Sequence, residues 1–208
     1  MNKQQMEKKM GFDLYGVKPK IKEGSVQPTR PDWNTATETE KDEYYSALDS
    51  YEAENKGVYF RNNVWWWRPL AQYVIEQTKV ITGKKKIQGF SYNDGVLISE
   101  KEAVQIAKQL KYLIQTGHTK KYEEEYMAVY EKAKLNNIKV QEELDEFQKA
   151  MDKKHGKDIA PKDYPKDDYA KWNTIYEKFD NNGSYPFSES NVQEFAEFAE
   201  QSGGFTIC

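Results

Sequence analysis

The segment 58–68, with the sequence VYFRNNVWWWR, concentrates residue types that bind flat, charged molecules. Three of the five tryptophans of the chain lie side by side in it. Neighbouring side chains diverge in a helix and in a strand, so at least one of Trp65, Trp66 and Trp67 must point away from the core. Our candidate ligand-binding residues are Tyr59, Arg61, Asn62, Asn63, Trp65, Trp67, Arg68, Asn93 and Asp94.

The arginines and asparagines beside the tryptophans define the chemistry of this segment. Arg61 and Arg68 carry planar cations, which grip phosphates and stack on rings. Asn62 and Asn63 carry paired donors and acceptors that can read the edge of a ring, and an exposed indole is a platform for the ring itself. A second interpretation stays open, in which the arginines stack on the tryptophans and the asparagines cap a helix. The cluster would then be purely structural.

Several classes of enzyme lack their signature residues in this chain. The two histidines, His118 and His155, lie in charged stretches, which argues against a histidine base or a His-rich metal site. The sequence contains no Walker loop, GxGxxG, GxSxG or HExxH motif. Two segments imitate calcium loops, but Phe90 and Lys178 would occupy their first ligand positions, so neither supplies the usual oxygen shell. We therefore expect no metal and no cofactor, and we nominate no catalytic residue.

The overall composition indicates no class of binding partner, so partners must be inferred from individual segments. The 208 residues include 31 basic and 34 acidic residues. The formal charge of -3 therefore produces no overall positive potential that would attract nucleic acid. The single cysteine, Cys208, excludes an internal disulfide framework and is compatible with a reducing compartment. The polar N-terminus and the lack of a long apolar stretch argue against a secretion signal and a membrane partner. We expect a soluble, cytoplasmic protein.

Hydrophobic periodicity predicts a mainly helical chain. The clearest helix begins at the capping-box pair Ser99 and Glu102 and ends at Gly117. An amphipathic helix covers 65–81, with regular helix from about Arg68, because Pro69 suits a first turn. The remaining predicted helices cover 39–54, 119–155 as an antiparallel pair broken at Asn136 and Asn137, 169–179, and Ser188 to Gly203.

The other segments are predicted to be short strands, loops and a tail. Residues 11–20 suit a short strand followed by a turn, and residues 96–98 suit either a short strand or a buried entry into the next helix. The lysine-rich segment 83–90 suits a basic loop. The C-terminal sequence FTIC suits an apolar tail that docks on the core. Strands and helices do not alternate as a parallel sheet would require. The predicted fold is one compact, mainly α domain over 1–208, with about six or seven helices and minor short strands.

Four sequence motifs resemble a family of uncharacterised proteins encoded mainly by bacteriophages and by bacteria that carry phage genes. They are MGFDLYG at 10–16, YFRNNVWWWRPL at 59–70, NDG at 93–95 and EFAEFAEQSGGFTIC at 194–208. The resemblance implies a phage origin and a setting inside an infected bacterial cell, and it carries over no activity. Residues 26–55 and 118–165 look like variable insertions, the first a loop and helix and the second a helical hairpin.

A phage origin and an aromatic, arginine-rich cluster together favour a binding function. We hypothesise a protein that sequesters an anionic, ring-bearing, nucleotide-derived immune signal as a counter-defence factor, without turnover. Two alternatives stay open: an inhibitor that occupies a host defence protein through aromatic and charged helices, and an enzyme that cleaves a nucleotide. The site can be formed within one chain or between two copies in a homo-oligomer.

Overall fold

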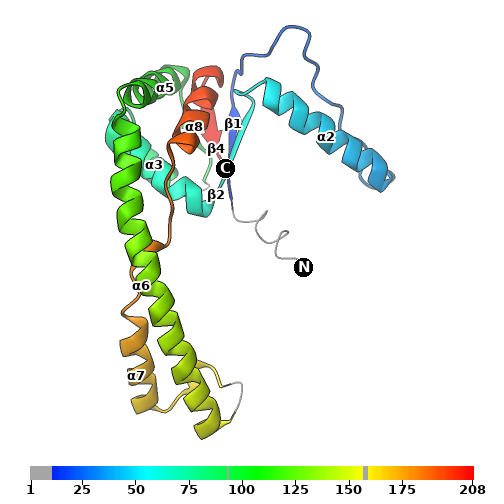
Figure 1. Cartoon of the computed structure of the whole chain (residues 1–208). Helices are drawn as coiled ribbons and strands as arrows, with labels where there is room; N and C mark the ends of the chain where they lie inside the picture. Colours follow the sequence, from blue (N-terminus) through cyan, green and yellow to red (C-terminus); the bar gives the residue numbers. More distant parts are fainter. Residues whose placement is uncertain (1–10, 93, 157–158) are drawn as a thin grey trace. The chain divides into compact units, whose positions relative to one another are not determined.

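The computed structural model describes residues 11–92, 94–156 and 159–208, and in these residues the fold is mainly α, as predicted. It contains seven α-helices and one small sheet of four strands (Figure 1). The helices are α2 (Glu38–Glu54), α3 (Val64–Thr78), α4 (Lys84–Gly89), α5 (Glu100–Gln115), α6 (His118–His155), α7 (Lys166–Tyr176) and α8 (Glu189–Gln201). The strands are β1 (Gly11–Gly16), β2 (Tyr59–Asn63), β3 (Val96–Ile98) and β4 (Phe205–Ile207).

The chain divides into two compact units. The first consists of Met1–Lys121 together with Phe187–Cys208, and the second of Tyr122–Pro186. The first unit therefore holds the whole sheet and the C-terminal strand. The segment 118–165, which the sequence marked as an insertion, falls almost entirely in the second unit.

The sheet of the first unit is antiparallel throughout, with the strand order β2-β1-β4-β3. Asp13 pairs with Arg61, and Tyr15 pairs with Tyr59 on one side and Thr206 on the other. The C-terminal residues thus form a central strand, and the prediction that this apolar tail docks on the core is confirmed. Strand β2 was not foreseen in the sequence.

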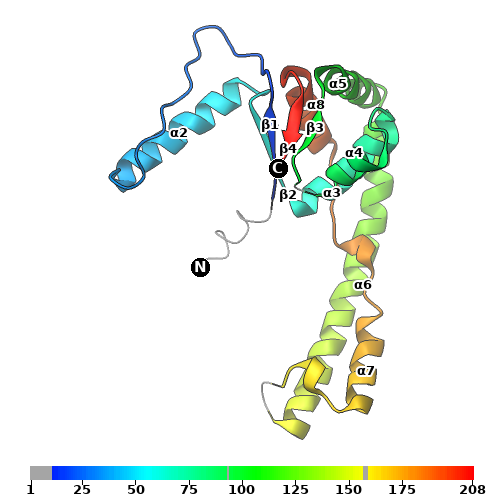
Figure 2. The ribbon, with the colours of Figure 1, turned by 180° about the vertical axis from the view of Figure 1, so that it is seen from behind.

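Alternate residues of each strand face the helices and form the core of the first unit. Leu14, Phe205 and Ile207 are fully buried, and Phe12 and Phe60 are nearly so. Helices α3, α5 and α8 lie together on this side of the sheet (Figures 1 and 2). The opposite face carries Tyr15, about half of which is exposed. This alternation is the pattern of a sheet that has one face on the core and one face toward solvent.

Helix α3 begins earlier than the sequence predicted. The side-chain oxygen of Asn63 accepts hydrogen bonds from the backbone N–H groups of Trp65 and Trp66, both at 3.1 Å, and so caps the helix. This cap lets the helix start at Val64 instead of Arg68. Pro69 then lies inside the helix, where it removes the N–H that would have bonded to the carbonyl of Trp65 and its ring crowds that carbonyl.

The lysine-rich segment 83–90 is not a loop. Its residues 84–89 form the short helix α4, which agrees with the good helix propensity of lysine and glutamine. A Cβ atom on Gly89 would lie 2.4 Å from side-chain atoms of Val96, so the helix packs against β3 more closely than any larger residue permits. The prediction of a basic loop here was therefore wrong.

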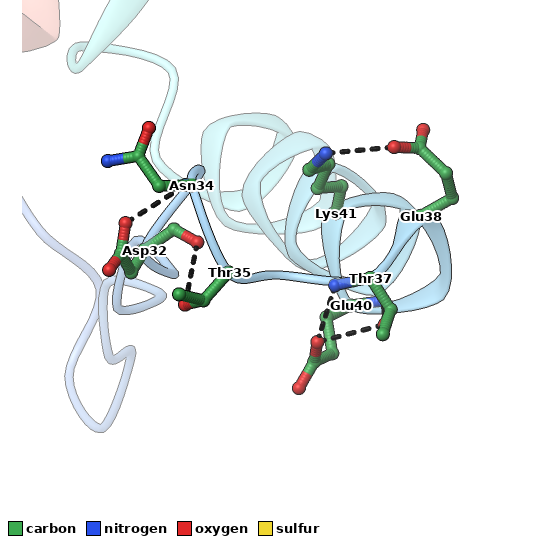
Figure 3. A network of polar contacts seen from close by, with 7 residues as sticks. All are labelled: Asp32, Asn34, Thr35, Thr37, Glu38, Glu40 and Lys41. Atoms are coloured by element: carbon green, nitrogen blue, oxygen red, sulfur yellow. Dashed lines mark hydrogen bonds and ion pairs between the residues drawn. The ribbon is translucent and has the colours of Figure 1, made fainter.

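Capping signals located α5 and α8 correctly, and the spacing of apolar residues located α2. Ser99 and Glu102 form the predicted reciprocal capping box at the start of α5, and Gly117 follows its end with a left-handed φ of 74°. Ser188 caps α8 as predicted. Thr37 and Glu40 form a second capping box at the start of α2 (Figure 3). In the same view the Asp32 carboxylate accepts the backbone N–H of Asn34 at 3.0 Å, and Lys41 pairs with Glu38 at 2.8 Å.

In the second unit, the prediction of two helices broken at Asn136 and Asn137 is wrong, because α6 is one continuous helix of 38 residues. Both asparagine side chains are used in long-range contacts. Asn136 donates to the carbonyl of Lys178 at 3.0 Å, and Asn137 exchanges two hydrogen bonds of 2.8 Å with the backbone of Asp180. Because these partners satisfy the amides, the asparagines stay helical despite their tendency to end helices.

Candidate functional site

The three adjacent tryptophans diverge, as the sequence required. Trp65 is 47 % exposed, whereas Trp67 is fully buried. The indole N–H of Trp67 donates to the carbonyl of Phe90 at 2.7 Å, and its ring stacks on Phe12 with centroids 5.3 Å apart. Trp67 is therefore a core residue, and its prediction as a ligand-binding residue is corrected. Trp65 is the member of the triplet that faces outward.

The two asparagines of the segment also have structural roles. Asn62 lies on the inner face of β2, where its side chain donates to the side-chain oxygen of Asn191 at 2.6 Å. Asn191 in turn donates to the carbonyl of Trp66 at 3.3 Å, so it joins β2, α3 and α8. Asn62 is thus removed from the candidate ligand-binding residues. Asn63 is exposed and caps α3, which confirms the structural interpretation for this residue.

Tyr59 and Arg61 lie on the solvent face of the sheet, opposite Tyr15 and Asp13. The hydroxyl of Tyr59 donates to the carboxylate of Asp13, and Nε of Arg61 lies 3.7 Å from the same oxygen. The rings of Tyr15 and Tyr59 are 5.3 Å apart. Burial is the main cause that raises the pKa of Tyr59 far above its usual value, and the hydrogen bond to Asp13 is the second cause. An incoming anion would therefore have to compete with Asp13 for Arg61.

Arg68 lies in a different environment, at the edge of a hollow of about 580 Å³ between α3 and α4. A hollow of this size suits a small organic ligand. Its lining residues are Arg68, Ala71, Gln72, Ile75, Glu76, Ile87, Phe90, Ser91 and Tyr92. All of them belong to the first unit, so one unit forms the entire hollow.

One wall of the hollow is a polar row along α3. Arg68, Gln72 and Glu76 follow each other at intervals of four residues, so they lie on one face of the helix. The rise of an α-helix separates the first from the last by about 12 Å along the axis. The side-chain amide of Gln72 donates to the carboxylate of Glu76 at 2.9 Å. The row therefore presents a cation at one end and a carboxylate at the other.

The other wall of the hollow is aromatic and aliphatic. Ile87 of α4 and Tyr92, which follows α4, are 41 % and 64 % exposed, so their side chains are accessible to a ligand. Ile75 supplies a further apolar, partly buried side chain from α3. Apolar walls with a few polar groups at fixed positions are typical of sites for small molecules. The hollow can hold a flat ring against these walls while Arg68 binds an attached anion.

Arg68 was predicted from the sequence as a ligand-binding residue, but the other residues that line the hollow were not. The row of Arg68, Gln72 and Glu76 was visible as a spacing of four residues. Ile87 was concealed because its segment was read as a loop. Among the other candidate residues, Asp94 is exposed and does not line the hollow, and Asn93 lies outside the described residues.

Comparisons with protein-family models, curated proteins and solved structures gave no match to this chain. Within the described residues, no group of three His, Cys, Asp or Glu side chains is arranged to hold a metal ion. No helix in the described ranges is long and apolar enough to cross a membrane. The hollow between α3 and α4 is therefore the strongest indication of function in the described residues.

Proposed function

We propose that the protein binds an anionic, ring-bearing small molecule of the nucleotide class in the hollow between α3 and α4. One observation carries the proposal: a single hollow of about 580 Å³ is lined by Arg68, Tyr92 and Glu76. A cation, an accessible aromatic ring and a carboxylate are the groups needed to bind a phosphate, a base and the amino group of a base.

Each part of the hollow has a defined role in this proposal. The Arg68 guanidinium binds a phosphate oxygen pair, since its planar fork matches that geometry. Tyr92 and Ile87 hold the ring between them, and the carboxylate of Glu76 accepts hydrogen bonds from an exocyclic amine. The distance of about 12 Å between the ends of the α3 row suits a molecule that carries its phosphate and its base at opposite ends.

The proposed biological setting is sequestration of a nucleotide-derived immune signal by a phage protein. The resemblance of four motifs to phage-encoded proteins supports this setting, and binding without turnover needs no catalytic group. Such a protein acts by lowering the concentration of free signal, so its abundance and affinity together must keep the free signal below the dissociation constant of the host receptor. Its ligand is expected to leave the protein chemically unchanged.

The test is a binding experiment with the full chain and a panel of mononucleotides, cyclic dinucleotides and ADP-ribose derivatives. Isothermal titration calorimetry detects binding, and chromatography of the ligand after denaturation shows whether it is intact. We expect Arg68→Gln to weaken binding about 10- to 100-fold, because a hydrogen bond to a charged group contributes about 1.5–3 kcal/mol.

Arg61→Gln is the matched control, because it removes the same guanidinium from the sheet face outside the hollow. It should leave the affinity within about twofold of wild type. Equal losses in the two variants would contradict the location of the site. Recovery of cleaved ligand would instead support an enzyme, and the lack of micromolar binding to any member of the panel would contradict the proposal as a whole.

A further inference from the structure

A second part of the first unit has a charge opposite to that of the whole chain. Residues 79–112 contain seven lysines and three acidic residues, a net charge of +4, whereas the chain as a whole carries -3. This segment begins directly after α3 and covers α4, β3 and most of α5. The basic charge is therefore concentrated in one segment of an acidic protein, and a local concentration of basic charge attracts polyanions.

Four of the seven lysines line two adjoining hollows that share Val80 and Gln105. The first, of about 650 Å³, is lined by Thr78, Lys79, Val80, Gln105, Lys108, Gln109 and Tyr112. The second, of about 610 Å³, is lined by Val80, Lys86, Leu97, Ser99, Lys101, Glu102 and Gln105. We call this combined surface the basic groove. It does not include Arg68, Tyr92 or any other residue of the α3–α4 hollow.

Helix α5 forms the floor of the basic groove along one face. Lys101, Gln105, Lys108 and Tyr112 recur at spacings of three and four, so they form one stripe. The stripe is about 16 Å long, given the rise of an α-helix. A nucleic acid strand places a phosphate every 3.4 Å or so in a duplex, and the stripe therefore spans about five nucleotides or fewer.

Three lysines of the groove are available for an external anion. Lys86 is paired with Glu102, but within the described residues Lys79, Lys101 and Lys108 form no ion pair. Tyr112 is 59 % exposed at the end of the stripe and offers its ring. Lysines that meet phosphates and an exposed aromatic ring that stacks on a base are the combination found in proteins that bind single strands without sequence preference.

We propose that the basic groove binds a short stretch of single-stranded nucleic acid. Lys79, Lys101 and Lys108 contact the phosphates, and Tyr112 stacks on a base. A duplex is less suitable, because its bases are already stacked and leave no role for Tyr112. The basic groove and the α3–α4 hollow share no lining residue, so substitutions of Lys79, Lys101 and Lys108 remove no group from the hollow.

The test is fluorescence anisotropy of the full chain with a labelled oligo(dT) 12-mer and an oligo(U) 12-mer over a range of salt concentrations. Three phosphate contacts predict a slope of about -2 in the plot of log affinity against log salt, because a single strand gives about -0.7 for each contact. The triple variant Lys79→Gln, Lys101→Gln, Lys108→Gln should bind at least tenfold more weakly and lose most of this slope.

Two controls distinguish single-strand binding in the basic groove from nonspecific electrostatic binding and from duplex binding. A triple variant of Lys139, Lys149 and Lys171 to Gln removes the same charge from exposed positions of the second unit, and it should bind within about threefold of wild type. Tyr112→Ser should weaken single-strand binding at least fivefold and leave any duplex binding unchanged. Equal losses in the two triple variants, a preference for duplex, or binding to anionic phosphatidylserine vesicles but not to either oligonucleotide would overturn the proposal.

Discussion

Replacement of Trp67 by phenylalanine tests how the tryptophan triplet is divided between core and surface. Trp67 is fully buried, and its indole N–H donates to the carbonyl of Phe90 at 2.7 Å. Phenylalanine keeps a stacked ring but leaves that carbonyl unpaired, which costs about 1–3 kcal/mol, and it leaves a small cavity that adds about 1 kcal/mol. We therefore expect Trp67→Phe to lower the free energy of unfolding of the first unit by about 2–4 kcal/mol.

The same substitution at Trp65 is the matched comparison, because Trp65 is 47 % exposed. Exposed substitutions usually change stability little, and we expect Trp65→Phe to cost less than about 1 kcal/mol. Urea titration followed by far-UV circular dichroism gives the total change. Hydrogen exchange of the backbone amides of α5 and α8 assigns it to the first unit. A cost of less than about 1 kcal/mol for Trp67→Phe, or an equal loss of stability in the two variants, would contradict the burial of Trp67 and the exposure of Trp65.

Two further substitutions test close packing and charge. A Cβ atom on Gly16 would lie 2.0 Å from the carbonyl oxygen of Gly57, so Gly16→Ala should destabilise the first unit by about 1–3 kcal/mol; an unchanged thermal melting curve would contradict this close approach. In the second unit, hydrogen bonds hold the pKa of Asp168 below its usual value; the larger effect comes from Lys154 and the smaller from His155. The stabilisation that comes from a lowered folded-state pKa is fully present above the unfolded-state pKa of about 3.9. This stabilisation is lost as the pH falls through the folded-state pKa. Asp168→Asn should therefore lower the melting temperature at pH 7, and its difference from wild type should shrink as the pH falls below the unfolded-state value of about 3.9. An equal loss across this pH range would refute the assignment.

Local signals in the sequence were sufficient for most of the helices. The capping box of Ser99 and Glu102 and the cap at Ser188 depend on residues within one turn, so the sequence alone contains them. Long-range contacts explain the errors. Asn136 and Asn137 resemble a helix break until their partners on the segment after α7 are known. Local propensity could not supply those partners.

Strand β2, which lies in the segment 58–68, could not be predicted either, because it also depends on a long-range contact. Its inner face carries Phe60 and Asn62, and a buried asparagine interrupts the alternation that would identify a strand. The side chain of Asn191, which is 129 residues away in the sequence, satisfies this asparagine. The divergence of the tryptophans could be predicted from geometry, but which of them is buried depends on the helix start that Asn63 sets.

The candidate site was only partly visible for a related reason. Arg68 was identified, and the row that it forms with Gln72 and Glu76 follows from helical spacing. The second wall of the hollow could not be predicted, since α4 was read as a loop. The sequence also grouped Arg61 with Arg68, whereas the structure places one on the open face of the sheet and the other in the hollow.

The most direct test of the central claim is an NMR titration of the isotopically labelled protein with the tightest-binding nucleotide of the panel. The proposed function predicts that shifted backbone amide signals cluster on residues 68–76 of α3 and on residues 87–92. It also predicts that the side-chain Nε–H signal of Arg68 moves on binding. Shifts centred instead on Tyr15, Tyr59 and Arg61, or spread evenly over both units, would contradict a binding site in the α3–α4 hollow.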